Sequence, residues 1–303
     1  MVSKPYQVLM GLSALHREAR RAHLFVMDAG FRQSEAFLAL LEGHPAMELV
    51  IDAHTIPDYE TLRDHRHLIA GADLFVEDDR VSLYRLFRSL KPRTLSVVEE
   101  GIGTYSSHYW SRASDIAGRL KAAKWAVVST LTGCGMKIGG GRKTRHVYCA
   151  RPELFAKLNP DIAHKARRIE GLALFRDHFA RLVADRLEPL PGSQAVMALL
   201  GWHSPSKETL AKWLDHEGPL YFKPHPHRPE LAEVLNTGQL LPDLIPAEYL
   251  IDFLDHAHDR LDIYHSASSA CVFYPFEGSS GLRFHSTVER WYTARLASAM
   301  ASL

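Results

Sequence analysis

Cysteine is scarce in this chain of 303 residues, no long apolar run occurs, and the charges nearly balance. The three cysteines, Cys134, Cys149 and Cys271, are odd in number and far apart, which excludes a disulfide framework and favours a reducing, cytoplasmic compartment. No apolar run approaches the roughly 20 residues of a membrane span, and no signal peptide is predicted. The formal net charge of +1 gives no reason to expect a nucleic-acid partner.

Metal and phosphate signatures are missing as well. The 18 histidines are scattered and include no H-E-x-x-H or comparable ligand pair, so the sequence predicts no metal dependence and no cofactor. Five glycines between positions 133 and 141 match neither of the two glycine-rich phosphate-loop patterns. We therefore expect a mobile loop there.

The chain does contain an alternation of apolar segments with helical patterns. With 46% hydrophobic residues, it can fill about two cores. The alternation indicates the α/β class, with two Rossmann-like domains facing each other across a cleft. We expect domains at residues 1–155 and 191–303, joined by a helical bridge at 156–190. Strands are predicted at 22–27, 47–51, 72–76, 94–98, 195–200, 220–222, 261–264 and 270–274.

Some further segments carry specific expectations. Residues 1–4 leave no room for a full strand before the helix that opens at Pro5. Helical patterns predict a long polar helix at 58–69 and a closing helix at 287–299, whereas residues 125–130 favour a strand.

Polar residues stand at the ends of three apolar segments, at 99–101, 223–226 and 266–269. Paired carboxylates such as Glu99 and Glu100 raise each other's pKa when desolvated, which suits one of them to act as a general base. Gly101 lets the backbone turn sharply and lets a substrate come close. Hydroxyl and N–H groups that follow a strand form an anion site. Taken singly, a solvated turn or an ordinary helix cap explains each motif better.

Two prolines bracket His225. Each proline fixes its own φ and keeps the preceding residue extended, so Lys223 and His225 are held at the carboxyl end of a strand. Ligands of parallel α/β sheets bind at that end. A lone His-Pro turn would simply face water, but in company with the other two motifs it predicts a site.

Taken together, the ordered motifs resemble the bacterial sialyltransferases of GT-B architecture, above all the lipooligosaccharide sialyltransferases and the polysialic-acid capsule enzymes. The resemblance rests on Glu99-Glu100-Gly101, on Lys-Pro-His-Pro at 223–226 and on Ser268-Ser269. It covers most of the chain, but Lys4 stands where the family has Thr or a similar small residue. Weaker matches are Lys4-Pro5-Tyr6-Gln7, Gly103-Thr104-Tyr105, Val147-Tyr148 with Arg151-Pro152-Glu153, and Ile245-Pro246-Ala247-Glu248.

The resemblance implies transfer of sialic acid from CMP-sialic acid to a glycan hydroxyl, with inversion and without a metal. Glu100 would be the general base with Glu99 supporting it, and His225 would hydrogen-bond or protonate the departing phosphate. Lys223 and Glu248 would hold the cytidine and its ribose, and the two serines would bind the phosphate. The full set of implied substrate-binding residues is Gly101, Lys223, Pro226, Glu248, Ser268, Ser269, Gln7 and Gly201.

Other functions stay open at this point. Transfer of another CMP-activated sugar such as CMP-Kdo, or of a sugar from a nucleotide diphosphate, would use the same fold. A non-catalytic nucleotide-sugar binding protein would not need a general base. A capsule-type polymerase typically carries basic membrane-binding helices, of which the chain has only modest examples. We expect a glycan or glycolipid acceptor, and the resemblance allows peripheral contact with the inner membrane and a homodimer.

Overall fold

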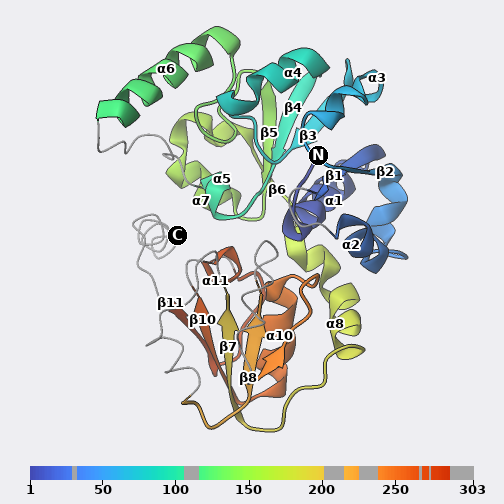
Figure 1. The fold of residues 1–303 in the computed structure, drawn as a ribbon, viewed down its shortest axis with the longest axis vertical. Coiled ribbons are helices and arrows are strands. Elements are labelled where there is room, and N and C mark those ends of the chain that lie inside the picture. The colour runs from blue at the N-terminus through green and yellow to red at the C-terminus, as the bar shows by residue number, and fades with distance from the viewer. Residues whose placement is uncertain are drawn as a thin grey trace. The chain divides into compact units, whose positions relative to one another are not determined.

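The computed structural model describes residues 1–28, 33–105, 116–200, 215–224, 238–265, 268–272 and 274–286. The chain divides into two compact units, unit 1 with Met1–Leu172 and unit 2 with Ala173–Ala297 (Figure 1). Each unit has its own parallel β-structure and its own helices.

Unit 1 contains two groups of parallel strands. The strands β3 (Asp73–Val76), β4 (Thr94–Val98), β5 (Thr144–Cys149) and β6 (Ala166–Arg168) form one sheet in that order, whereas β1 (Ala22–Met27) pairs with β2 (Val50–Ile56). The sequence of β4 is rich in apolar residues, and four of its five residues are buried. This burial is typical of a parallel strand with both faces covered.

Met1 and Val2 connect the two groups of strands. Val2 forms a parallel bridge with Val26, with hydrogen bonds from Val2 N to Phe25 O at 3.0 Å and from Met27 N to Val2 O at 2.9 Å. On the other side, the amino group of Met1 donates to Phe75 O of β3 at 2.8 Å. These two residues therefore take the place of a central strand, from which β1 and β2 extend one way and β3 to β6 the other.

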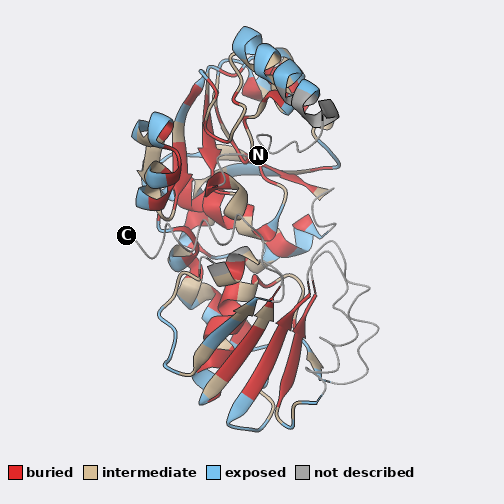
Figure 2. Cartoon of the chain, turned by 90° about the vertical axis from the view of Figure 1, so that its left-hand side faces the viewer, coloured by how far each residue is buried: buried red, intermediate tan, exposed pale blue. Residues whose placement is uncertain are grey.

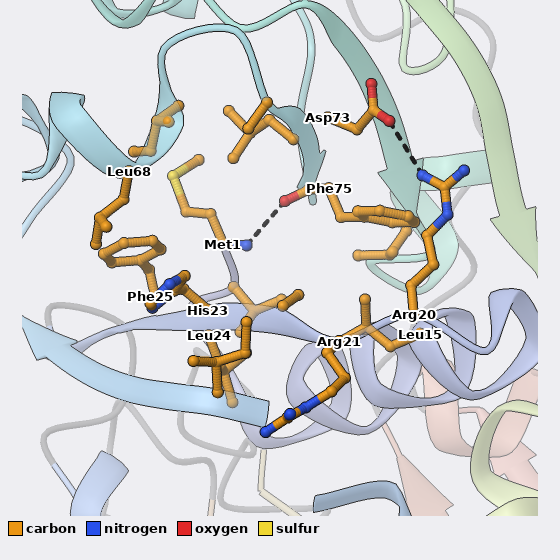
Figure 3. Close-up of a pocket in the computed structure, with 18 of the residues that line it drawn as sticks. Met1, Leu15, Arg20, Arg21, His23, Leu24, Phe25, Leu68, Asp73 and Phe75 are labelled. Carbon is orange, nitrogen blue, oxygen red and sulfur yellow. Dashed lines mark hydrogen bonds and ion pairs between the residues drawn. The ribbon is translucent and has the colours of Figure 1, made fainter. Parts of the chain in front are cut away.

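A cavity of about 340 Å³ lies beside this short connection, between β1 and β3. Figure 3 shows Met1 between Phe25 of β1 and Phe75 of β3, with Leu24 and Leu68 also on the cavity wall. The structure thus agrees with the expectation that residues 1–4 do not form a full strand.

The first helix, α1 (Pro5–Glu18), is the central helix of unit 1. Proline suits its first position because the missing N–H would have no partner there. All residues from Gln7 to Leu15 are buried. The other helices of this unit are α2 (Ser34–Leu40), α3 (Arg66–Ile69), α4 (Tyr84–Leu90), α5 (Ile102–Tyr105), α6 (Ile116–Thr132) and α7 (Pro152–Leu158). Turns of 3₁₀ helix occur at Pro45–Leu49, Thr61–Arg63, Val81–Leu83, Pro160–Lys165 and Gly171–Phe175.

Unit 2 contains one parallel sheet with the order β11-β10-β7-β8-β9. The first strand in the chain is central, and the strand order reverses between β7 and β10. Helices α8 (Arg176–Ala184) and α10 (Ala247–Ala257) pack together, with the ring of Phe179 stacked on that of Tyr249 at 4.4 Å. Figure 2 shows the central strands of this sheet largely buried. The strands are β7 (Gln194–Leu199), β8 (Leu220–Lys223), β9 (Gln239–Leu240), β10 (Arg260–His265) and β11 (Leu282–Ser286), and the short helix α11 (Ser269–Val272) follows β10.

The predicted α/β class with parallel sheets is confirmed. Two Rossmann-like domains that face a cleft stay a prediction, and so do the domain limits at 155 and 191. The two compact units meet in the chain between Leu172 and Ala173, inside the segment predicted to be a bridge.

Several predicted elements are wrong. Residues 125–130 lie within α6 and residues 270–272 within α11, because short apolar runs do not distinguish a strand from a helix. The strand expected at 47–51 begins only at Val50, since Pro45 starts a 3₁₀ turn. The helix expected at 58–69 is present only in part. Asp58 accepts hydrogen bonds from Glu60 N and Thr61 N, a 3₁₀ turn covers Thr61–Arg63, and α3 begins only at Arg66. The closing helix at 287–299 lies outside the described residues.

The glycine-rich segment 133–141 is held by hydrogen bonds to two charged side chains, Asp79 and Lys165, contrary to the expected mobile loop. The carboxylate of Asp79, which is fully buried, accepts hydrogen bonds from Gly139 N at 2.8 Å and Gly141 N at 3.1 Å. The ammonium group of Lys165 donates to the carbonyl oxygens of the same two glycines at 2.9 and 2.8 Å. The segment is therefore a structural loop attached to the end of β3.

Candidate functional site

Three polar side chains stand at the carboxyl edge of the parallel strands of unit 1, and two of them, Ser3 and Glu77, flank the point where the strand order reverses. Ser3 follows the Val2 bridge, Glu77 follows β3 and Glu99 follows β4, so each lies at the carboxyl end of a parallel segment. The hydroxyl of Ser3 donates to the carboxylate of Glu77 at 2.8 Å. Open α/β sheets bind their ligands at such a reversal, outside the carboxyl ends of the strands. This edge is the candidate site of unit 1.

Glu99 is a buried carboxyl with three hydrogen-bond donors. Its side chain is 1% exposed. The hydroxyls of Tyr6 and Tyr105 donate to its two oxygens at 2.7 Å each, and Ala150 N donates at 2.8 Å. Burial raises the pKa of Glu99, and the three donors act in the opposite direction. The side chain is thus fixed in place and links α1, β4 and the chain after β5.

Glu100 follows Glu99 in the chain, but the hydrogen-bonding environment of its carboxylate differs from that of the Glu99 carboxylate. Its backbone N–H donates to Thr104 Oγ1 at 2.8 Å, whereas no donor to its carboxylate is found among the described residues. Gly101 has φ of +109°, a conformation that favours glycine, so the predicted sharp turn is present. Two residues further on, Gly103 is essential to the placement: a Cβ atom there would lie 1.6 Å from Glu100 Oε1.

Charged groups surround Glu100 on the same edge. Burial raises the pKa of Glu100 to about 7, and Asp78 and Glu77 act in the same direction. Arg80 and Lys4 lower the pKa, but they do not offset the burial. At neutral pH a substantial fraction of this carboxyl is therefore ionised and able to accept a proton. The arrangement suits proton abstraction from a bound hydroxyl.

The sequence analysis did not identify Glu77, a second acidic residue that follows a strand of this sheet. Glu77 follows the apolar run 74–76, and it accepts hydrogen bonds from Ser3 and from the hydroxyl of Tyr59 at 2.7 Å. The run followed by an acid is the same signal that singled out Glu99 and Glu100. The predicted substrate-binding residue Gln7 is 1% exposed, and its side-chain oxygen accepts a hydrogen bond from Ser3 N at 3.0 Å. Its role toward a substrate stays a prediction.

The candidate site of unit 2 also lies at the carboxyl edge of a parallel sheet. Lys223 ends β8 and His265 ends β10, and both pair in register with Leu199 of the intervening strand β7. The two residues are therefore two strand spacings apart, or about 10 Å between backbones. Of the residues predicted from sequence, Lys223 and Ser268 come to this edge.

Lys223 is a buried cation with an acidic neighbourhood. Its side chain is 5% exposed, and its ammonium group donates to Asp243 O at 2.7 Å. Burial lowers the pKa of Lys223 to about 8, while Asp243 and Glu248 act to raise it. Glu248, on the first turn of α10 after Pro246, is itself buried. Lys223 and Glu248 thus interact electrostatically, and their roles toward a nucleoside stay a prediction.

His265, which the sequence did not indicate, lies at the end of β10 and contacts the backbone of the predicted residue Ser268. Its side chain is 6% exposed, and its Nδ1 accepts a hydrogen bond from Ser268 N at 3.2 Å. Burial lowers the pKa of His265 to about 4, so the ring is neutral and can serve as an acceptor. The structure places the backbone of Ser269 at the start of α11. The predicted residues Gly201, His225 and Pro226 lie outside the described residues.

Comparison with known proteins identifies no family. No protein-family model matches the chain, and no curated protein matches it. Among solved structures, the E. coli heptosyltransferase WaaC with ADP is 11% identical, with a TM-score of 0.40 and coverage of 99% of this chain and 98% of that chain. E. coli heptosyltransferase WaaC with ADP-2-deoxy-2-fluoro heptose is 12% identical, with a TM-score of 0.41 and coverage of 99% and 97%. Likeness at this level establishes neither a shared family nor a shared activity.

Within the described parts of the chain, no helix combines the length and the apolar character needed to cross a bilayer.

Proposed function

We propose that the protein is an inverting glycosyltransferase that moves sialic acid from CMP-sialic acid to a hydroxyl of a glycan acceptor. The observation that carries this proposal is the Glu100 carboxyl. It stands at the carboxyl edge of the unit 1 sheet, it is partly buried, and its pKa is about 7. A general base is most effective when its pKa lies near the working pH, because it is then both ionised and basic enough to take the proton.

In this mechanism Glu100 takes the proton of the acceptor hydroxyl. The oxygen electron pair forms the new bond to the anomeric carbon, and the bond from that carbon to the phosphate breaks, with its electron pair leaving on CMP. Attack opposite the departing phosphate inverts the anomeric centre. Glu99 is the positioning residue: its three hydrogen bonds fix the backbone from which Glu100 projects.

The donor half of the mechanism rests on the carboxyl edge of unit 2. A departing phosphate gains negative charge, so cations and hydroxyl donors directed at it lower the barrier. Lys223, with a pKa of about 8, is mostly protonated near neutral pH. In the proposal Lys223 and Glu248 hold the cytidine and ribose, while Ser268, Ser269 and His225 contact the phosphate. No metal is required in this scheme.

The donor assignment is tested by calorimetry of the full chain with CMP, CDP, UDP and GDP. We expect CMP to bind most tightly, Glu248→Gln to weaken that binding, and Glu100→Gln to leave it unchanged as the matched control. Tighter binding of UDP or GDP, or equal losses in both variants, would contradict the assignment.

The sugar is tested separately, by incubation of the enzyme with CMP-sialic acid or CMP-Kdo and a galactose-terminated oligosaccharide. Transfer of sialic acid, seen as a mass increase of the acceptor, supports the proposal. Transfer of Kdo alone would assign the enzyme to the other CMP-sugar class.

A further inference from the structure

A cluster of imidazoles lies on the outer strand pair of unit 1. Side chains alternate between the faces of a strand, so His23 and Phe25 of β1 share one face. Phe25 pairs in register with His54 of β2, which puts Asp52 and His54 on that same face. The cluster therefore combines two imidazoles and a carboxylate from neighbouring strands.

An irregularity in the strand pairing positions Asp52. The partner of Ala22 is Val50, whereas the partner of Leu24 is Ala53, so one additional residue of β2 is accommodated opposite His23. Such a bulge redirects side chains and is common next to functional positions. Here it places the carboxylate of Asp52 beside the His23 ring.

The distances in the cluster fit metal ligands better than hydrogen bonds. His54 Nε2 lies 3.4 Å from His23 Nδ1, and His23 Nδ1 lies 3.5 Å from Asp52 Oδ2. The three ligand atoms all lie within 4.8 Å of one another. Hydrogen bonds of this kind are mostly 2.7–3.2 Å long. By contrast, with Zn–N and Zn–O bonds of about 2.0–2.2 Å, two ligand atoms of a tetrahedral zinc ion stand about 3.3–3.6 Å apart.

Neighbouring rings hold the imidazole of His54 in position. The Phe25 ring stacks on it with centroids 4.8 Å apart and an interplanar angle of 16°. The ring of His65 approaches both, at 5.1 Å from His54 and 5.2 Å from Phe25. A ligand whose ring plane is fixed by packing loses little freedom when it binds an ion. Asp52 has a side chain 62% exposed and that of His23 is 27% exposed, so an ion and its remaining water ligands can reach the cluster from solvent.

We propose that His23, Asp52 and His54 bind one divalent ion of the zinc class, which imidazole and carboxylate ligands suit. The ion cross-links β1 to β2, a strand pair that the main sheet of unit 1 contacts through the short Met1–Val2 connection. Its role is structural. His23 lies near the amino end of β1, whereas Glu99 and Glu100 follow the carboxyl end of β4, so the ion takes no part in the proposed transfer.

The test uses the full chain without a histidine tag, freed of metal and titrated with ZnCl₂ in a calorimeter. We expect one site of micromolar affinity or tighter. His23→Ala and His54→Ala should each weaken it by about tenfold or more, since even partners outside the ligand shell affect affinity by 10–100-fold. The matched control is His164→Ala, which removes an exposed histidine elsewhere in unit 1 and should change nothing.

Two further measurements keep the test decisive. Asp52 has an exposed side chain, so Asp52→Asn should fold and should bind Zn²⁺ more weakly than the wild type. This variant therefore tests the site even if a histidine variant fails to fold. Co²⁺ should give the visible d–d absorption of a tetrahedral site in the wild-type protein and not in His54→Ala. Wild-type affinity in the millimolar range, or equal Zn²⁺ affinity in the wild type and the His23→Ala/His54→Ala double variant, would overturn the proposal.

Discussion

Gly103 leaves open the space that the carboxylate of Glu100 fills. A Cβ atom on Gly103 would lie 1.6 Å from Glu100 Oε1 and 2.7 Å from its carboxyl carbon. Non-bonded heavy atoms attract best at about 3.5–4.0 Å, so the two groups cannot coexist in this arrangement. The position of the proposed base therefore depends on the absence of a side chain two residues beyond Gly101.

Gly103→Ala should consequently displace the Glu100 carboxylate. Because a small misplacement of a reacting group can cost about 10²-fold in rate, we expect a turnover loss of that order with CMP affinity unchanged. Urea denaturation should show little loss of stability, since alanine favours the helix α5 in which Gly103 lies. The control is Gly11→Ala in α1, where a Cβ atom makes an ordinary contact at 3.5 Å. Full turnover in Gly103→Ala would show that this placement of Glu100 is not needed.

The pH dependence of turnover should follow Glu100. Its pKa is about 7, and only the ionised form accepts a proton, so turnover should rise with pH through that value. Lys4→Gln removes a positive charge that lowers this pKa, and should move the acidic limb of the pH–rate profile to higher pH. Glu77→Gln removes a negative charge that raises it, and should move the limb to lower pH. If both variants move the limb in the same direction, or not at all, another group controls the profile.

Tyr6→Phe should destabilise the fold in a pH-dependent way. The variant removes one donor from the ionised form of buried Glu99, at a cost of about 1–3 kcal/mol in the free energy of unfolding. The pKa of Glu99 is already raised in the folded state and should rise further. The loss should therefore be small at low pH, where the carboxyl is protonated in both folded and unfolded states, and should grow as the pH increases. Urea denaturation at several pH values measures it, with Tyr84→Phe on α4 as the control.

Removal of metal should lower the thermal stability of the protein without changing its turnover. If the ion at His23, Asp52 and His54 is structural, EDTA should lower the Tm of zinc-loaded protein, because ligand binding to the folded state adds stability. Turnover at a temperature well below the Tm should remain essentially unchanged. Loss of turnover that Zn²⁺ or Mg²⁺ restores, without a change in fold by circular dichroism, would instead assign the transfer to a metal-dependent enzyme.

The sequence predicted which polar residues follow the strands better than it predicted which distant residues their side chains contact. The pair Glu99-Glu100 and the residue Lys223 were singled out because each ends an apolar run and is followed by a glycine or a proline, which is local information. Ser3 and Glu77 could not be paired from sequence, since the strand order brings together residues that are 74 positions apart. The cluster of His23, Asp52 and His54 was missed for a similar reason, because it depends on strand pairing and on an irregularity within it.

Element types failed where the apolar pattern was short or mixed. Residues 125–130 include β-branched side chains and resemble a strand in isolation, yet they lie within the seventeen-residue helix α6. The glycine-rich loop suggested mobility because glycine adopts many conformations, but the sequence did not indicate that Asp79 and Lys165 would meet its backbone. Buried polar contacts between distant segments are the part of this fold that local patterns do not specify.

The most direct test of the proposed mechanism is the turnover of Glu100→Gln measured beside its affinity for CMP. The substitution keeps the size of the side chain and removes its ability to accept the proton. We expect turnover from CMP-sialic acid to fall by about 10²–10⁴-fold, the usual share of a general base, with the Kd for CMP unchanged. Near-normal transfer by Glu100→Gln would contradict the assignment of Glu100 as the base, and with it the mechanism proposed for this protein.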